Sequence, residues 1–325
     1  MNTLIFDAKQ NSIEEISDKA ASILKYGGIV IFPTETVYGI GADAFNTNAV
    51  EKIFNIKKRA KDNPLIFHIS SEDMLNSIAE TTSLAKKLIK HFWPGPLTLV
   101  LKSKIEKIFT FGLDTIAVRM PENLLALKII EKLGNPVVAP SANISGKPSS
   151  TDFEHVLQDF NGKVECIVDG GGTVYGIEST VIDISENKAI LLRPGALSIE
   201  DIENLNIKVV LAEKMELKKR SPGTRYRHYA PDKPLILFEN IDELKDILNQ
   251  HKNTKIGYMG LFEPSLKIDI RITFRSLVEY GRMLFSSLRY FDSVDVDMII
   301  AQLPEDKGIG RAIRDRLVRA SGTEK

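Results

Sequence analysis

Two spacings of apolar residues alternate along the N-terminal two thirds of the chain, and each predicts a different element. Between residues 13 and 24, apolar side chains recur at helical spacing, which predicts an amphipathic helix. Ser12 and Glu15 form the capping pattern that begins such a helix, and Gly27-Gly28 ends it. The β-branched run at 29–32 then predicts a strand.

The same two patterns continue, in short elements, to about residue 212. Helices are predicted from about Ala49 to the cations that begin at Lys57, over 84–92 and 124–133, and from Thr151 onward, where Thr151 and Glu154 repeat the capping pattern. Strands are predicted over 97–101, 116–118, 136–139, 164–168, 179–184 and 189–193. Because helices and strands are interleaved irregularly, we expect an α/β fold with a mixed sheet and flanking helices rather than a regular barrel.

The pattern changes after about residue 212. Residues 218–227 hold five cations and no acidic side chain around a Pro-Gly pair, which is typical of a linker. Beyond residue 234, predicted strands at 235–238, 255–259 and 297–303 alternate with predicted helices at 241–250, 275–290 and 310–320. We therefore expect a first domain at 1–212, a linker arm at 213–233, and a small Rossmann-like α/β domain with a parallel sheet at 234–325.

Composition narrows the class of protein. The chain has 325 residues, with 43 basic and 43 acidic side chains and one Cys. One Cys excludes a disulfide framework and a Cys-based zinc site. No apolar run approaches the ~18–20 residues of a membrane span, and the N-terminus has neither signal-peptide nor transit-peptide character, so we expect a cytoplasmic protein with no membrane contact. Zero net charge argues against a surface that binds nucleic acid throughout, although a local basic patch stays open.

Two loops carry more polar side chains than a plain turn needs. Residues 33–41, directly after the first strand, hold two Thr, a Glu and a Tyr between a Pro and two glycines. This segment is either the wall of a site or an ordinary strand exit with hydrogen-bonded hydroxyls. Residues 57–61 hold four cations where a helix ends, which the helix macrodipole alone favours. The same charges before Asn63-Pro64, with His68 after an apolar strand, also suit a polyphosphate.

Further polar clusters follow later strands. Arg119 ends a short apolar strand, where its charge either faces solvent or binds a carboxylate. Residues 139–146 carry two Ser and one Asn, which fit an oxyanion or phosphate cradle and fit a turn cluster equally well. The glycines of 169–172 permit a close backbone approach, but no Gly-Lys-Ser/Thr follows, so they do not form a Walker loop. Cys166 lies inside an apolar strand and is expected in the core.

Together these motifs resemble one family, the YrdC-like threonylcarbamoyl-AMP synthases, in their long form with an extra C-terminal domain. The resemblance is carried by Pro33-Thr34-Glu35-Thr36-Val37-Tyr38-Gly39, by segments 57–68, 93–98, 118–121 and 139–146, by Glu178-Ser179-Thr180-Val181, by 192–195 and, for the linker of the long form, by 221–231. The order and spacing of these motifs match from about residue 20 to residue 231, and the rest of the chain matches in pattern only. The chain departs from the family at Lys58 and Ala60, where Gly and Pro are usual, and we expect a stiffened or reshaped loop that keeps its neighbouring cations.

The resemblance implies a YrdC-like twisted mixed sheet and the activity of a nucleotidyltransferase, an adenylyltransferase acting on threonine carbamate. The implied reaction joins L-threonine, bicarbonate or CO2, and ATP into threonylcarbamoyl-AMP and pyrophosphate, the first step of tRNA threonylcarbamoyladenosine modification. A threonylcarbamoyl transferase is the implied downstream partner, and a weak contact with tRNA stays open. Mg²⁺ is expected with the ATP phosphates, no organic cofactor is expected, and no residue is assigned as a metal ligand.

The resemblance also assigns residues to roles. Lys57 and Arg59 are the catalytic cations on the phosphates. The residues assigned to threonine are Thr36, His68, Arg119, Ala139 and Ser179. Those assigned to ATP are Lys57, Arg59, Asn63, Thr115, Ser141, Asn143, Ser149, Arg193, His228 and Tyr229. The linker arm is expected to fold over the pocket, bring His228 or Tyr229 onto ATP, and exclude water from the labile carbamate and mixed anhydride.

Two other functions compete with this interpretation. A non-catalytic RNA-binding or translation-associated module would use the basic stretch at 218–227, but it should interleave aromatic side chains with the cations, and only Tyr226 and Tyr229 qualify. A carbamoyl-phosphate-using transferase of hydrogenase maturation contains the same fold, but it would require zinc-finger cysteines, which one Cys cannot supply. An amino-acid pocket built from Thr36, Arg119 and Ser179 favours the synthase.

Overall fold

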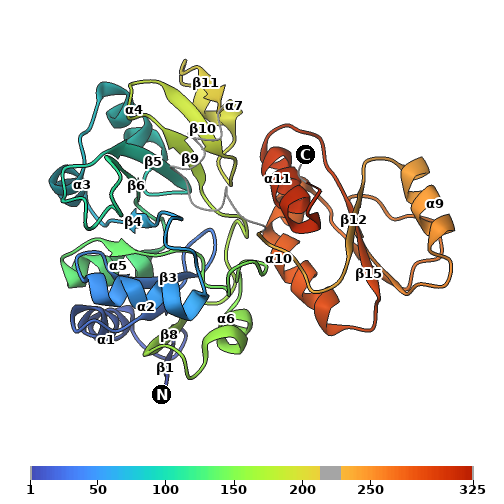
Figure 1. The fold of residues 1–325 in the computed structure, drawn as a ribbon, viewed down its shortest axis with the longest axis horizontal. Helices are drawn as coiled ribbons and strands as arrows, with labels where there is room; N and C mark the ends of the chain where they lie inside the picture. The colour runs from blue at the N-terminus through green and yellow to red at the C-terminus, as the bar shows by residue number, and fades with distance from the viewer. Residues whose placement is uncertain (1, 213–227, 324–325) are drawn as a thin grey trace.

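The structure is a computed structural model that describes residues 2–212 and 228–323. Figure 1 shows two lobes, one around an eleven-stranded sheet and a smaller one around a four-stranded sheet. Most of the predicted linker arm lies outside the described residues.

The larger sheet is mixed, as the irregular interleaving predicts. Its strands are β1 (Leu4–Asp7), β2 (Val30–Phe32), β3 (Gly39–Asp43), β4 (Ile66–His68), β5 (Leu97–Lys102), β6 (Thr115–Arg119), β7 (Val137–Val138), β8 (Cys166–Asp169), β9 (Thr180–Asp183), β10 (Ala189–Arg193) and β11 (Val209–Leu211). They lie in the order β1-β8-β2-β3-β7-β4-β6-β5-β9-β10-β11. Parallel pairs such as β4 with β6 and β5 with β9 alternate with antiparallel pairs such as β2 with β3 and β5 with β6.

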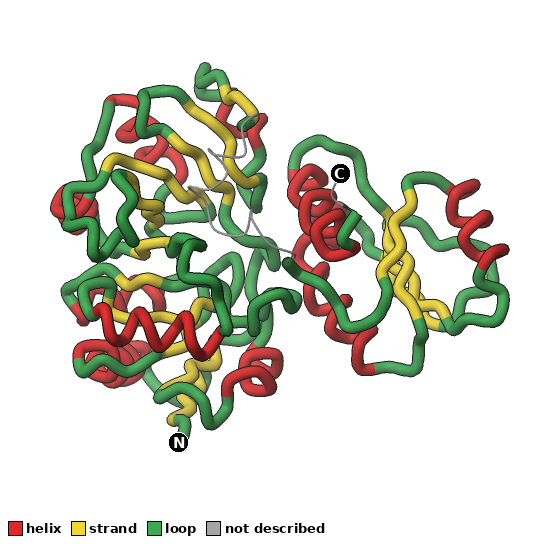
Figure 2. Tube along the Cα trace, viewed as in Figure 1, coloured by secondary structure: helices red, strands yellow, loops and turns green. Residues whose placement is uncertain are grey.

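Helices of the N-terminal part lie around the strands of this sheet (Figure 2). They are α1 (Ile13–Lys25), α2 (Thr47–Lys57), α3 (Glu72–Ile78), α4 (Ser83–Phe92), α5 (Leu124–Leu133), α6 (Phe153–Phe160) and α7 (Ile199–Glu203). The predicted cap of α1 is confirmed, because the Ser12 side chain accepts a hydrogen bond from the Glu15 amide at 3.1 Å. The predicted cap of α6 is off by one residue: Asp152, not Thr151, accepts from the Glu154 amide.

The smaller sheet is wholly parallel, with strand order β12-β15-β13-β14. Its elements are β12 (Leu235–Phe238), α9 (Ile241–Gln250), β13 (Ile256–Gly260), β14 (Ile270–Thr273), α10 (Leu277–Ser293), β15 (Met298–Gln302) and α11 (Ile309–Ser321). Helices α10 and α11 lie on the side turned toward the larger lobe, and α9 lies on the opposite side (Figure 1). This is the expected doubly wound arrangement, with one strand more than predicted.

The extra strand β14 is an edge strand whose side chains alternate between half-buried and exposed positions. Arg271 and Thr273 occupy the exposed positions, so the segment lacks the apolar run that predicted the other strands. Cys166, at the start of β8, is fully buried as expected, and burial raises the pKa of its thiol to about 12.

Candidate active site

One pocket brings together most of the predicted site residues. It lies where loop 33–38, the end of α2 and the strands β4 and β6 meet, and residues 228–229 also line it. The predicted residues that line it are Thr36, Lys57, Arg59, His68, Arg119, Ala139, Ser141, Asn143, Ser179, Arg193, His228 and Tyr229. The sheet register explains part of this convergence, because the parallel pairing of β4 with β6 sets His68 opposite Arg119.

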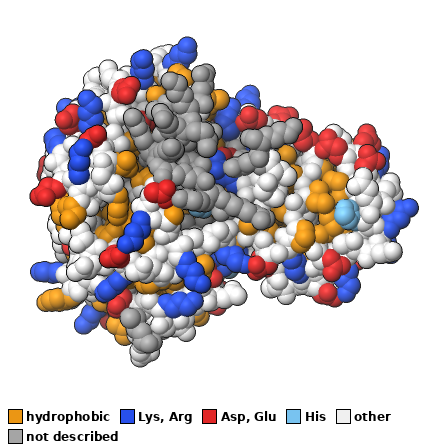
Figure 3. Space-filling view, in the orientation of Figure 1, with side chains coloured by type: hydrophobic (Ala, Val, Ile, Leu, Met, Phe, Trp, Pro, Cys, Tyr) orange, Lys and Arg blue, Asp and Glu red, His pale blue; other side chains and the backbone are white. Residues whose placement is uncertain are grey.

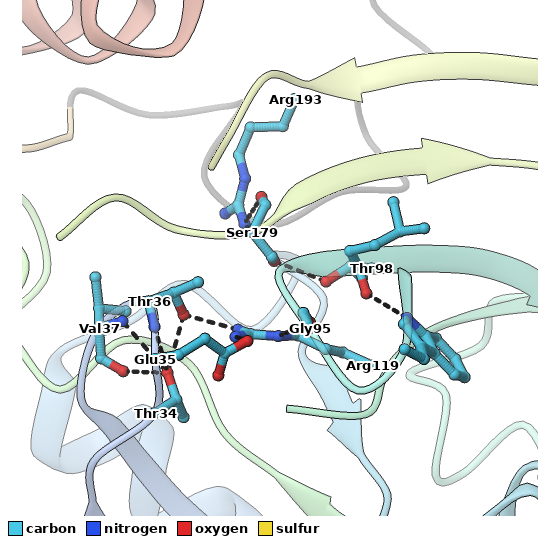
Figure 4. Close-up of polar contacts among 11 residues, drawn as sticks. Thr34, Glu35, Thr36, Val37, Gly95, Thr98, Arg119, Ser179 and Arg193 are labelled. Carbon is cyan, nitrogen blue, oxygen red and sulfur yellow. Dashed lines mark hydrogen bonds and ion pairs between the residues drawn. The ribbon is translucent and has the colours of Figure 1, made fainter. Parts of the chain in front are cut away.

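Arg119 is almost fully buried, with 3% of its surface exposed. Three neighbours hold its guanidinium in place (Figure 4). Its Nη1 donates to the Thr36 hydroxyl at 2.9 Å, its Nη2 donates to Glu35 Oε1 at 2.6 Å, and its Nε donates to the Gly95 carbonyl at 3.2 Å. A charged fork held this rigidly is suited to bind a carboxylate. Of the two alternatives that the sequence left open, Arg119 does not face solvent, and the carboxylate that it binds in the structure is that of Glu35.

The hydroxyl that Arg119 contacts belongs to a short relay within loop 33–38. Thr34 Oγ1 donates to the Val37 carbonyl at 2.6 Å and lies 2.9 Å from Thr36 Oγ1. Since the single Thr34 proton is used on Val37, the Thr36 hydroxyl must donate to Thr34 and accept from Arg119. The relay fixes the orientation of both hydroxyls before any ligand arrives.

His68 is a neutral polar group beside this cation. It is 3% exposed, and its Nδ1 has no hydrogen-bond partner among the described residues. Burial, together with the positive charge of Arg119, lowers the His68 pKa to about 3. The ring is therefore uncharged at neutral pH and keeps one nitrogen for a ligand.

Ser179 lies just before β9 and belongs to a second polar group (Figure 4). Its hydroxyl lies 2.7 Å from that of Thr98 on the neighbouring strand β5. Arg193 Nη2 donates to the Ser179 carbonyl at 2.9 Å and to its hydroxyl at 3.3 Å. Ser179 thus connects the region around Arg119 with a further buried guanidinium.

Lys57 and Arg59 form the cationic wall of the pocket. Lys57 ends α2, is 1% exposed, and its Nζ donates to the carbonyls of Ser141, at 2.5 Å, and Asn143. Arg59 is half-buried and donates to the carbonyl of Pro64 at 3.0 Å. Burial lowers the pKa of Lys57 well below its usual value and that of Arg59 to about 10, and in each case a neighbouring cation contributes. An incoming anion would favour the charged form of both groups.

Lys58, the first position at which the chain departs from the family pattern, lies between these two cations. Lys58 caps α2 in the left-handed conformation, with φ of 53°. This conformation favours glycine, the usual family residue, and is strained for a side chain with a Cβ. The Lys58 backbone keeps the helix-ending geometry that glycine adopts easily.

Ser141 and Asn143 have the side-chain contacts of a turn cluster. The Ser141 hydroxyl donates to Asn143 Oδ1 at 2.6 Å, and Asn143 Nδ2 donates to the carbonyls of Ile144 and Lys147. Their own carbonyls are the ones that hold Lys57. Both interpretations of segment 139–146 therefore apply: the side chains close a turn, and the turn lies in the wall of the pocket.

Three residues assigned to ATP do not line the pocket. Thr115 begins β6, four residues before Arg119, which separates the two Cα atoms by about 13 Å at the usual rise of a strand. The Asn63 carbonyl accepts from Arg59 Nε at 3.3 Å, which makes it a support of that side chain. The Ser149 hydroxyl donates to Glu178 Oε1 at 2.6 Å, so Ser149 reaches the pocket through Glu178.

Several contributing residues were not assigned from the sequence. Thr34, Glu35, Thr98 and Glu178 all lie inside the motifs that carry the resemblance, so the motifs themselves were the signal. Arg316 had no such signal. It lies on α11 of the smaller lobe and donates to Glu178 Oε2 at 2.9 Å.

Basic side chains outnumber acidic ones in the described lining of the pocket. Lys57, Arg59, Arg119 and Arg193 line it, and Glu178 is the acidic residue among its described lining. Among residues 2–212 and 228–323, no cluster of three or more His, Cys, Asp or Glu side chains is suited to hold a metal ion. Within the same ranges, no helix combines the length and the apolar character that crossing a bilayer requires.

Comparisons with known proteins agree with this site. A family model described as "Telomere recombination" matches residues 22–195, and one described as "Threonylcarbamoyl-AMP synthase, C-terminal domain" matches residues 197–322. The threonylcarbamoyl-AMP synthase of Pyrococcus abyssi is 44% identical, and the match covers 98% of each chain. A putative threonylcarbamoyl-AMP synthase of Methanocaldococcus jannaschii is 34% identical over 61% of this chain and 94% of its own.

A solved structure extends the likeness to three dimensions. The crystal structure of Pyrococcus abyssi Sua5 complexed with L-threonine superposes with a TM-score of 0.91 at 42% identity, covering 99% of this chain and 98% of that one. The mixed sheet and the second domain are therefore those of a known fold. The chain belongs to the Sua5/YciO/YrdC family, in the form that carries a C-terminal threonylcarbamoyl-AMP synthase domain.

Proposed function

We propose that this chain is a threonylcarbamoyl-AMP synthase, which converts L-threonine, bicarbonate and ATP into threonylcarbamoyl-AMP and pyrophosphate. The observation that supports this most directly is the buried fork of Arg119 in the same pocket as Lys57 and Arg59. One cation group suits an amino-acid carboxylate, and the other suits a polyphosphate. The names of its two-domain relatives agree with this activity.

At the Arg119 end, the threonine carboxylate would accept hydrogen bonds from the guanidinium and from the Ser179 hydroxyl, while the Thr36 hydroxyl, whose proton goes to Thr34, keeps the guanidinium in place. Neutral His68 adds a polar nitrogen without adding charge. The free threonine amine then attacks the carbon of CO2, or of bicarbonate, and forms a C–N bond. On CO2 the electron pair of one C=O bond moves to oxygen and the nitrogen loses a proton. On bicarbonate a C–O bond also breaks, and the hydroxyl group leaves with the proton from nitrogen as water; the product in both cases is a carbamate.

At the other end, a carbamate oxygen attacks the α-phosphorus of ATP. The bond from this phosphorus to the bridging oxygen breaks, and pyrophosphate leaves with the electron pair. Lys57, Arg59 and Arg193 would neutralise the charge that builds up on the phosphate oxygens. No side chain has to act as a covalent nucleophile, so the contribution of the protein is orientation and charge.

Mg²⁺ is the ion expected with ATP, and the described pocket does not offer it a carboxylate set. The two buried carboxylates near the pocket, Glu35 and Glu178, are already paired with Arg119 and Arg316. Such a pair does not match the several free oxygen ligands that Mg²⁺ takes. Mg²⁺ would therefore enter on the phosphates of ATP rather than on a protein-held site.

His228 and Tyr229 support a proposal about closure. Both line the pocket together with the cations Arg59 and Arg193. In this position the two side chains would lie against bound ATP and exclude water from it. The predicted linker residues 213–227 lie outside the described residues.

The downstream partner, a threonylcarbamoyl transferase, and a weak tRNA contact remain proposals that rest on the reaction alone. The competing RNA-binding module has little support from the surface. On the face in Figure 3, acidic and basic side chains of the described residues are interspersed over both lobes rather than gathered by sign. The basic stretch at 218–227 lies outside the described residues.

The deciding experiment measures pyrophosphate release from ATP by the purified chain, with threonine and bicarbonate each left out in turn. We expect release only when both are present, and the adenylate product should contain carbon from labelled bicarbonate. Release that is indifferent to threonine would contradict the proposed function. Binding of tRNA without any pyrophosphate release would favour the RNA-binding module.

A further inference from the structure

Arg316 is the largest fully buried side chain among the described residues, and it lies at the boundary between the two lobes. It belongs to α11 of the C-terminal domain, and 1% of its surface is exposed. Its Nε donates to Glu178 Oε2 at 2.9 Å, and its Nη2 donates to the Pro194 carbonyl at 3.0 Å. Its guanidinium also lies 5.3 Å from the centre of the Tyr229 ring. One side chain of the second domain therefore has three contacts outside that domain's sheet.

Each of these contacts is with a part of the proposed nucleotide end of the pocket. Glu178 and Tyr229 line the pocket, and Pro194 is the chain neighbour of the pocket residue Arg193. Glu178 also accepts from the Ser149 hydroxyl, so Arg316 and Ser149 together fix both of its carboxylate oxygens. At the threonine end, Ser179 is the chain neighbour of Glu178, but the described contacts of Arg316 do not include Ser179, Arg119 or Thr36.

Charge balance makes this arrangement more than a packing contact. Burial alone would raise the pKa of Glu178, but the charges of Arg316 and Arg193 outweigh it and hold that pKa below its usual value. An ionised carboxylate in a pocket for phosphates would repel them unless a cation neutralises it. Arg316 supplies this neutralising cation. Its Nη1 donates to Asp315 Oδ2 at 2.5 Å, so the guanidinium charge is itself balanced by a second carboxylate.

Tyr229 needs such support because its backbone is strained. Its φ is 65°, in the left-handed region that bulky residues rarely adopt. The ring is held on one side by stacking on Phe285, with centroids 5.1 Å apart, and Arg316 lies over it. Both holding groups come from helices of the C-terminal domain, α10 and α11. The strain persists because these neighbours determine the position of the ring.

We propose that Arg316 is a positioning residue for ATP, acting through Glu178 and Tyr229, so that the C-terminal domain completes the nucleotide end of the active site. This inference rests on the proposed function. It differs from simple attachment of one domain to the other, which Arg289 illustrates. Arg289 donates to the Pro148 carbonyl at 2.8 Å and pairs with Asp159 at 2.7 Å, and neither of those residues lines the pocket.

The test compares steady-state KM values for ATP and for threonine in Arg316→Lys and Arg316→Met with those of the unaltered chain. We expect KM for ATP to rise about tenfold or more in both variants, since lysine keeps the charge but not the fork. KM for threonine should change by less than about twofold, because the contacts of Arg119 are untouched. A folded Arg316 variant with unchanged KM for ATP would overturn the inference.

Loss of Arg316 also leaves Glu178 buried without its partner. An effect of the substitution on stability must therefore be distinguished from an effect on ATP binding. The double variant Arg316→Met/Glu178→Gln removes both charges, so it should recover thermal stability and the part of ATP binding lost to repulsion by Glu178. KM for ATP should still stay above that of the unaltered chain, because the guanidinium over Tyr229 is missing. Complete recovery of KM along with stability would reduce Arg316 to a counter-ion and overturn the inference.

Two further variants serve as matched controls. Arg314→Met removes a cation of the same helix that pairs with Glu239 inside the C-terminal domain, and it should leave both KM values unchanged. Arg289→Met weakens the domain interface and should lower stability without the selective rise in KM for ATP. If the unaltered chain itself shows no threonine-dependent pyrophosphate release, the proposed function fails. If it is active but Arg316→Lys behaves like it, only this inference fails.

Discussion

The two ends of the pocket are built in different ways. The Arg119 end is assembled within the N-terminal domain: β4 and β6 set His68 beside Arg119, and loop 33–38 supplies Thr36 and Glu35. The Tyr229 end takes its support from the C-terminal domain, through Arg316 and Phe285. A carboxylate site can therefore be preformed within one domain, whereas the nucleotide site depends on how two domains meet.

The strongest way to break this comparison is to remove the carboxylate fork. We expect Arg119→Ala to reduce threonine-dependent pyrophosphate release by about 10³-fold, since a preorganised buried donor is lost. The variant also leaves Glu35 buried without its partner, which costs about 3–5 kcal/mol of stability. Arg119→Ala/Glu35→Gln should restore the unfolding midpoint but not the activity. Near-normal turnover in the folded double variant would remove Arg119 from the threonine site.

Lys57 tests the other end from within the N-terminal domain. We expect Lys57→Ala to reduce turnover by about 10²-fold, with a higher KM for ATP, because the phosphates lose a cation and the carbonyls of Ser141 and Asn143 lose their donor. Pyrophosphate release at varied ATP measures both parameters. Lys61→Ala is the matched control, since Lys61 is exposed and pairs with Glu51 on the surface. A rise in KM for threonine alone would place Lys57 at the threonine end of the pocket and contradict its proposed role at the phosphates.

His68 gives a test of the Arg119 end that needs no turnover. Its folded pKa of about 3 lies below the unfolded value, so the unfolded chain binds a proton that the folded chain does not. Stability should therefore fall by about 1.4 kcal/mol per pH unit from this group as pH drops from ~6.5 toward ~3. Urea unfolding at several pH values should show a smaller slope for His68→Gln than for the unaltered chain. Equal slopes would mean that His68 titrates normally.

The smallest effect concerns Lys58, which carries strain next to the phosphate cations. Lys58→Gly should raise the free energy of unfolding by about 1 kcal/mol, because glycine adopts a φ of 53° without a Cβ clash. Lys58→Ala removes the amine but keeps the Cβ, so it should bring no such gain. Denaturant midpoints of the two variants measure the difference. An equal gain in both would assign the effect to charge rather than to backbone conformation.

Local signals in the sequence located most of the elements and most of the pocket. His68 and Arg119, which the sequence puts at the ends of predicted strands, both line the pocket. Ion pairs between distant residues and the edge strand β14 were harder to predict. Nothing local indicates that Glu35 pairs with Arg119, and β14 has no apolar run. Thr115 was assigned to ATP by family pattern; it begins β6 and does not line the pocket, so its assignment stays a prediction.

Arg316 marks the limit of reading a sequence locally. It lies on an amphipathic helix among other arginines, and a cation on a helix surface is normally solvated. Only the docking of α11 against the larger lobe buries it beside Glu178. Contacts that cross a domain boundary depend on the relative placement of two folded units, which neither periodicity nor capping encodes.

The ion pair between Glu178 and Arg316 joins positions 138 residues apart in the chain. A substitution at either position leaves a lone charge in the interior, so natural variants are expected to change both together or neither. A chimera that takes its C-terminal domain from a relative would therefore be catalytically impaired whenever that domain lacks an arginine at the position of Arg316. This impairment is expected even if both domains fold well.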